Sequence, residues 1–322
     1  MIQSAVKASI VILFQVICAQ ALCAQDLNSS SVTNRQVTIL FQAFDQNLTP
    51  VKDIRAEDLK ISQNGKPAKV ISVQQLKDVA VSIVLLIDVS ISQEQTLPTQ
   101  KLAANKFLTA VINRPRDQAA VATFTNDLKV EQQFTGNLDS LGLAVNRAEI
   151  VYPPDGGRGR LVVGPPPKPS QAPPGSTAIW DVIVLTCNRW QGQSDPGVHR
   201  AIVLLTDGWD TSSKSRMSEA IQCANGKGIS IYSVGIGDPK FGGVDKSMLR
   251  KMSEETGGAA LFPKKDTDLI AQFEQLGTVF RNKYQLVFAK NDSSQPFSKI
   301  RIELINPQFK HAELSYQHSV SR

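Results

Sequence analysis

Strand and helix signals alternate along the chain between residues 80 and 283, and this alternation restricts the possible folds more than any other feature. Apolar runs at 81–87 and 201–206 have the length and composition of buried strands, and stretches with apolar residues at helical spacing separate such runs. This order is typical of a parallel sheet with helices on both faces. We therefore predict an α/β domain with a doubly wound, mainly parallel sheet over residues 80–283.

The same patterns predict the order of the elements within this domain. Proline, glycine and changes of periodicity mark where each element should end. We expect, in chain order, a strand at 81–87, a helix at 97–113, strands at 118–124 and 129–134, helices at 138–150 and 178–190, a strand at 201–206, a helix at 214–226, a strand at 229–234, a helix at 246–256, a short strand at 259–262 and a helix at 266–282.

A carboxylate and two hydroxyls follow the first strand of this domain in an Asp-x-Ser-x-Ser run, formed by Asp88, Ser90 and Ser92. Mg²⁺ prefers oxygen ligands in a near-octahedral arrangement and keeps some of its waters, so hydroxyls with one or two carboxylates suit it. Asp and Ser after a strand are also common helix N-caps. The run alone leaves both interpretations open.

Two distant segments favour the metal interpretation. Thr177 lies at the expected start of a helix, and Asp207, followed by Gly208, ends the second apolar strand. The carboxyl ends of neighbouring parallel strands meet at one crevice, which is where open α/β sheets bind ligands. We therefore expect Asp88 and Asp207 to lie close together.

The order Asp88-x-Ser90-x-Ser92, Thr177, Asp207 resembles the metal-ion-dependent adhesion site of von Willebrand factor A domains. The resemblance implies that Ser90, Ser92 and Thr177 supply hydroxyl ligands to Mg²⁺, or to Mn²⁺ or Ca²⁺. It implies that Asp88 and Asp207 bind the cation directly or through water. An Asp or Glu of a partner protein would complete the coordination, so that the metal bridges two proteins.

The segments on either side of the α/β domain predict a smaller β domain built from both chain ends. Residues 37–44, 60–62 and 69–73 are rich in β-branched and aromatic residues, as are 284–289 and 298–305. The Asn64-Gly65 pair is typical of a hairpin turn. We expect an N-terminal β segment at 35–78 to pack with a C-terminal β segment at 284–322. This domain order, with the stretches 56–61 and 281–286, resembles the von Willebrand factor A-related proteins of Acidobacteria.

The first 24 residues have the pattern of a secretory signal peptide. Lys7 precedes an apolar stretch at 8–17, and small residues follow at 19–24. An uncleaved membrane anchor is the alternative, but the apolar stretch is short for a span, and no later segment approaches about 20 apolar residues. We predict a signal peptide at 1–24, no transmembrane span after cleavage, and a secreted, periplasmic or cell-envelope protein.

Two further features lie within the mature chain. Residues 151–176 contain eight prolines, which predicts an irregular surface insertion that either shapes access to the metal face or has no function. Cleavage near Ala24 would leave Cys187 and Cys223. Export permits a disulfide between them, but two buried free thiols are the interpretation that we favour.

Several functional classes are disfavoured by the sequence. A net charge of +6 without basic clusters, with 6% aromatic residues, disfavours nucleic acid as a partner. The three histidines are scattered and no Cys-x-x-Cys pair is present, which argues against a zinc site. Phosphate-loop and serine-hydrolase motifs are absent, and Ser90 stands where a dehalogenase-type phosphatase needs its second acid. We expect no enzymatic activity.

Together these features predict a secreted or periplasmic binding module of the adhesion type. It would hold a divalent cation and use it to capture an acidic group of a protein partner. The alternative is a structural cell-envelope protein whose metal site is occupied but does not bridge to a partner.

Overall fold

The computed structural model describes residues 36–45, 48–76, 79–152, 176–190, 192, 197–291, 297–317 and 319–321. The expected signal peptide at 1–24 lies outside the described residues, as does most of the expected insertion at 151–176. Residues Gln36–Arg322 form one compact unit. The limits that we set between its α/β and β domains therefore stay a prediction.

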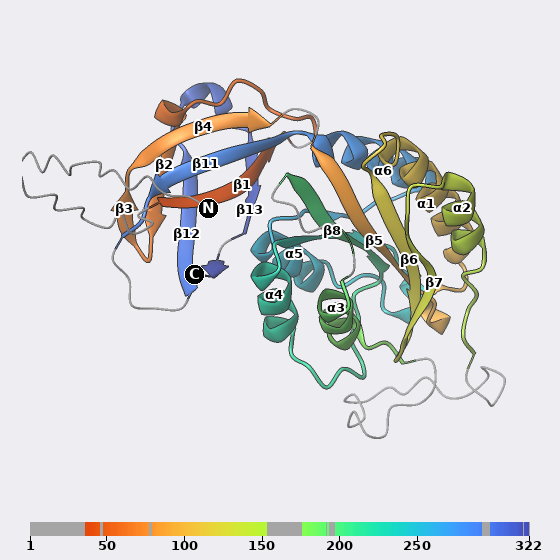
Figure 1. Ribbon diagram of the computed structural model, residues 1–322. Helices are drawn as coiled ribbons and strands as arrows, with labels where there is room; N and C mark the ends of the chain where they lie inside the picture. The colour runs from red at the N-terminus through yellow and green to blue at the C-terminus, as the bar shows by residue number, and fades with distance from the viewer. Residues whose placement is uncertain are drawn as a thin grey trace, which may run out of the picture. The chain divides into compact units, whose positions relative to one another are not determined.

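A six-stranded sheet with the order β10-β9-β8-β5-β6-β7 forms the centre of the α/β domain (Figure 1). All neighbouring strands are parallel except β6 and β7, which are antiparallel. The strands are β5 (Ala80–Asp88), β6 (Gln118–Phe124), β7 (Leu128–Thr135), β8 (Val198–Thr206), β9 (Ile229–Gly235) and β10 (Ala260–Leu261). In this sheet β5 and β8 are neighbours, so the two strands expected to carry the site lie side by side.

Six helices cover the two faces of this sheet. On β5, the alternate residues from Val81 to Ile87 pack in one core cluster with side chains of α1, α2 and α6, while Val84 and Leu86 pack in another with α3, α4 and α5. This follows from the alternation of side chains across a strand that is buried on both faces. The helices are α1 (Leu97–Val111), α2 (Leu138–Asn146), α3 (Ile179–Asn188), α4 (Met217–Gly226), α5 (Lys246–Glu255) and α6 (Asp266–Arg281). The predicted fold class is confirmed.

Some predicted helix limits are wrong, for physical reasons. The helix expected at 138–150 ends at Asn146, because the chain then returns to the sheet and the Val151 amide donates to the Val89 carbonyl at 3.0 Å. The helix expected to begin at residue 214 begins at Met217. The amides just before it, at 214 and 215, bind the carboxylate of Asp181 at 2.9 and 2.8 Å instead.

Two four-stranded antiparallel sheets are built from both ends of the chain, as expected. One has the order β13-β1-β11-β4 and the other β14-β12-β2-β3. Phe41, Ile61, Leu286 and Ile302 belong to the core that these sheets share. The strands are β1 (Gln36–Phe44), β2 (Leu59–Gln63), β3 (Lys66–Ala68), β4 (Val70–Leu76), β11 (Lys283–Ala289), β12 (Phe297–Leu304), β13 (Glu313–Tyr316) and β14 (Ser319–Ser321).

Two sequence expectations concern membrane spans and the cysteines. Across the residues that the structure describes, no helix has the length and apolar character to cross a membrane. Cys187 and Cys223 are both free thiols. Cys187 is buried as expected, whereas Cys223 is partly exposed.

Candidate metal centre

The two acidic residues of the candidate site are brought together by the pairing of β5 with β8. Asp88 is the last residue of β5, and Asp207 follows Thr206, the last residue of β8. The parallel register places Ile87 beside Leu205, so the next residues, Asp88 and Thr206, also lie side by side. Thr206 Oγ1 donates to Asp88 Oδ2 at 2.6 Å. The two carboxyls are close enough for the charge of Asp207 to act on Asp88.

Burial and mutual repulsion disfavour the charged forms of these two acids. Asp88 is fully buried and Asp207 is 2% exposed. Burial, and then the charge of Asp207, raise the pKa of Asp88 to about 7, although hydrogen bonds from Thr206 and Ser90 oppose the shift. Burial also raises the pKa of Asp207, against hydrogen bonds from Ser92, the Trp209 amide and Gln93. All of these donors are neutral, and among the described residues no cationic side chain forms an ion pair with either acid.

The loop after β5 folds its hydroxyls back onto the acids. The Ser90 amide donates to Asp88 Oδ1 at 2.9 Å, and the Ser90 and Ser92 hydroxyl oxygens lie 3.1 Å apart. Ser92 in turn hydrogen bonds to Asp207. The Ser90 side chain makes no capping bond to the short helix η2 (Ile91–Gln93), so the structure does not support its interpretation as an N-cap.

Thr177 lies beside the loop that follows Asp207. Its amide donates to Thr211 Oγ1 at 2.9 Å, and its carbonyl accepts from the Thr211 and Ser212 amides at 2.8 and 3.1 Å. It is 5% exposed. Among the described residues, no hydrogen bond joins the Thr177 hydroxyl to the other four predicted ligands. The structure therefore brings four of them together by direct contacts, and ties Thr177 to the same loops through its backbone.

Backbone geometry fixes the loop that carries Asp207. Gly208 has a φ of 88°, in the left-handed region that favours glycine, and a Cβ there would meet Leu249 Cγ at 3.0 Å. The Asp207 carbonyl accepts from the Asp245 amide at 2.9 Å, which links this loop to the start of α5. The turn after β8 thus needs glycine, and it holds the acid at the sheet edge.

Two polar residues of the site were not predicted. Thr206 orients Asp88, and Gln93 contacts both Ser92, at 3.3 Å, and Asp207. Gln93 is itself held by Gln100 Nε2, which donates to its Oε1 at 2.8 Å. The register of β5 on β8 could have indicated Thr206, but Gln93 depends on the path of a short helix that carries no sequence signal.

This donor set fits a hard divalent cation. It consists of carboxylates and hydroxyls, the oxygen ligands that suit Mg²⁺, Mn²⁺ and Ca²⁺. Within the described part of the chain, no three His, Cys, Asp or Glu side chains form a metal-binding group. Two buried carboxylates with only neutral donors leave negative charge that a bound cation would neutralise.

Comparison with known proteins agrees with the architecture. Residues 170–276 match the family model of the von Willebrand factor type A domain. The matched segment includes Thr177 and Asp207, whereas Asp88, Ser90 and Ser92 lie before it. This part of the α/β domain, from α3 to α6, is therefore similar to a von Willebrand factor type A domain. The likeness to proteins of Acidobacteria stays a prediction.

Solved structures with similar folds include three at low sequence identity. The conserved hypothetical protein BatB from Bacteroides thetaiotaomicron is 17% identical, with 62% of this chain and 98% of BatB covered and a TM-score of 0.45. A von Willebrand factor type A protein from Catenulispora acidiphila is 14% identical, with 90% and 75% covered and a TM-score of 0.45. Proximal thread matrix protein 1 from the mussel byssus, with a zinc-occupied MIDAS motif, is 16% identical, with 64% and 48% covered and a TM-score of 0.45. The search of curated proteins gave no match.

Proposed function

We propose that this protein is an exported binding module that captures an acidic group of a protein partner through a divalent cation. Asp88, Ser90, Ser92, Thr177 and Asp207 would hold the cation. The observation that carries the proposal is the pair of buried carboxyls, Asp88 and Asp207, which only neutral donors contact. The function is binding and not catalysis.

The physical reason is the charge balance at the end of the sheet. When bound, the cation supplies positive charge that offsets the two carboxylates and attracts a further carboxylate from outside. That attraction is stronger at a partly dehydrated face than in bulk water, because the effective dielectric constant is lower. The hydroxyls of Ser90 and Ser92 add ligands without adding negative charge, so the filled site is about neutral and its cation can still take an acidic group at an open coordination position.

Exposed aromatic side chains near the site favour a protein partner over a purely structural role. Trp209, two residues after Asp207, is 45% exposed, with its indole Nε1 donating to the Gly243 carbonyl at 3.1 Å. Tyr152 is 50% exposed, and its hydroxyl donates to Glu94 Oε1 at 2.6 Å, in the loop after β5. Tyrosine and tryptophan are the residue types that dominate binding energy at protein interfaces. Type A domains mediate protein interactions, and both aromatic residues lie on loops of the α/β domain.

Metal binding is tested by calorimetry on residues 25–322 with MgCl₂. We expect one binding site in the wild type and none in Asp88→Ala/Asp207→Ala. The matched control is Asp139→Ala, which removes an exposed acid on α2. Circular dichroism shows whether each variant is folded. Equal Mg²⁺ binding by the wild type and the double variant would refute the assignment of the site.

Partner capture is tested with the immobilised chain and proteins of the source envelope, in the presence of Mg²⁺. We expect EDTA to release the captured protein, and the double variant to capture none. A structural envelope protein with a non-bridging cation would bind Mg²⁺ in the calorimeter but would keep its partners in EDTA. Export is tested separately, by the N-terminal sequence of the protein recovered outside the cytoplasm, which should begin near residue 25.

A further inference from the structure

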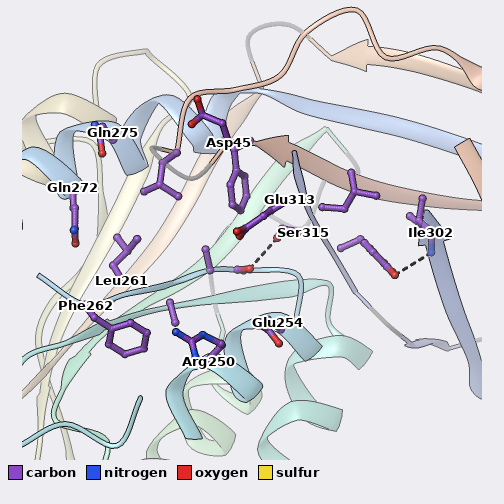
Figure 2. A pocket seen from close by; sticks show the side chains of 17 residues that line it. Asp45, Arg250, Glu254, Leu261, Phe262, Gln272, Gln275, Ile302, Glu313 and Ser315 are labelled. Atoms are coloured by element: carbon purple, nitrogen blue, oxygen red, sulfur yellow. Dashed lines mark hydrogen bonds between the residues drawn. The ribbon is translucent and has the colours of Figure 1, made fainter. Parts of the chain in front are cut away.

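A cavity of about 930 Å³ lies away from the candidate metal centre, at the edge of the six-stranded sheet. Its walls come from β10, α5 and α6 of the α/β domain and from β13 of a terminal sheet (Figure 2). Small-molecule and peptide-sized ligands occupy cavities of roughly 300–1,000 Å³. The volume is therefore sufficient for a few residues of a bound chain.

Two strand edges line this cavity. β10 is the last strand of the central sheet, and β13 is the last strand of its own sheet. The Ser233 amide of β9 donates to the Ala259 carbonyl at 3.0 Å, so the backbone groups of the next residue, Ala260, point to the opposite edge. That edge lines the cavity, where an added strand could pair with it.

One end of the cavity is closed by contacts between the two edges. Ser315 Oγ of β13 donates to the Gly258 carbonyl at 3.0 Å, and Gln317 forms an antiparallel bridge with Thr256. These contacts hold β13 beside the segment that leads into β10. The edges are thus fixed relative to each other, and β10 is open only beyond that point.

Acidic side chains outnumber basic ones on the walls. Asp45, Glu254 and Glu313 line the cavity, whereas Arg250 is the one cationic residue among its described lining residues. The Arg250 guanidinium lies 5.4 Å from the centroid of the Phe262 ring, against one wall. Within the described part of the chain, Glu254 and Glu313 form no ion pair. The cavity is negative in a chain whose net charge is +6, and so it attracts a cation.

A buried acceptor on α6 also lacks a partner. Among the described residues, the Gln272 side-chain oxygen has no hydrogen bond, although it is shielded from solvent. Gln272 lines the cavity with Gln275, and both residues belong to α6 (Figure 2). A buried acceptor without a donor costs free energy.

We propose that this cavity binds an extended segment of a partner protein that carries a lysine or arginine. The backbone of the segment adds as a strand beside Ala260, and its cationic side chain lies against Glu254 and Glu313. Strand addition takes its affinity from main-chain hydrogen bonds and its specificity from side-chain pockets. This site is separate from the cation site at the ends of β5 and β8, and takes a partner of the opposite charge.

The test uses fluorescence anisotropy on residues 25–322 with a labelled octapeptide of alternating threonine and valine that contains one central lysine. EDTA is present throughout, so that the candidate metal centre plays no part. We expect saturable binding that weakens with added salt. The same peptide with glutamate in place of lysine should bind at least about tenfold more weakly. A third peptide, N-methylated at alternate residues, should bind more weakly by a similar factor. Along one of its edges it lacks the N–H groups that pair with a neighbouring strand.

Matched variants locate the binding site on the protein. The double substitution Glu254→Gln/Glu313→Gln should lower the affinity for the lysine peptide by about tenfold or more. The control Asp139→Asn/Glu149→Gln makes the same charge change at exposed acids outside the cavity, and should bind like the wild type. No saturable binding, equal affinity for the lysine and glutamate peptides, or equal loss in the two double variants would each overturn the proposal. If the protein did not bind Mg²⁺, the expected peptide binding would be unchanged, because EDTA is present throughout the assay.

Discussion

Lys283 carries an amine into the protein interior at the start of β11, directly after α6. It is 5% exposed, and burial lowers its pKa from 10.5 to about 7. The charge of Lys283 acts on His199, whose own pKa is lowered by burial and then by that charge. The His199 ring lies with Nδ1 3.2 Å from the Phe280 carbonyl. Among the described residues, no acidic side chain forms an ion pair with Lys283.

The size of the effect follows from the two pKa values. The unfolded chain holds the Lys283 proton up to about pH 10.5, whereas the folded protein releases it near pH 7. Between these values the unfolded state binds more protons, so the free energy of unfolding rises with pH. A difference of one pKa unit between the folded and unfolded states corresponds to about 1.4 kcal/mol in the free energy of unfolding. The buried amine therefore lowers the free energy of unfolding by roughly 5 kcal/mol at pH 7 and below. This destabilisation becomes smaller as the pH approaches 10.

Substitution Lys283→Met removes this cost while keeping an unbranched side chain of similar length. Urea unfolding at about pH 7 and about pH 10 should show that the free energy of unfolding of the wild type rises by roughly 3 kcal/mol relative to that of Lys283→Met over this interval. Lys283→Met should be the more stable protein at pH 7. The control Lys310→Met removes an exposed lysine and should keep the wild-type profile. Parallel pH profiles for the wild type and Lys283→Met would refute the reasoning, because they would show that the amine is not the titrating group.

Other outcomes follow from single contacts. Thr206→Val removes the hydroxyl that donates to Asp88, and should lower Mg²⁺ affinity by about tenfold or more in calorimetry, since partners that orient metal ligands typically contribute that much. Asp117→Ala breaks a buried ion pair with the last helix, of 2.6 Å, and should lower the free energy of unfolding by about 3–5 kcal/mol in urea titration. Iodoacetamide should label Cys223 in the native mature chain and Cys187 only after unfolding, because Cys187 is buried and burial raises its pKa; peptide mass spectrometry would show the order, and equal labelling of both would contradict it.

The architecture could be predicted from the sequence because each element is long and regular. The strand that ends at Asp88 is buried along its whole length, and it reads as an unbroken apolar run. The short strands β3, β13 and β14 were not predicted. They have three or four residues each, and pairing with distant strands creates them, which no local pattern records.

The candidate site was predictable only in part. Topology alone brings Asp88 and Asp207 to one edge, since both end neighbouring parallel strands. The contact of Thr206 with Asp88 depends on the register of two strands, and the contacts of Gln93 depend on the path of a loop. The spacing of residues in the sequence predicts neither. The cavity beside β10 joins Asp45 to residues more than 200 positions later, so no sequence pattern could have placed them together.

The acids of the candidate site lower the stability of the fold, which is expected if they serve the binding function that we propose. Asp88 and Asp207 are both buried, and apolar residues in their place would cost less, as often happens when buried charges are replaced. The chain instead surrounds them with hydroxyl and amide donors from Thr206, Ser90 and Ser92, which favour the charged forms that burial disfavours. Such an arrangement makes physical sense where a cation supplies the missing positive charge. Residues that serve binding often lower the stability of the fold in this way.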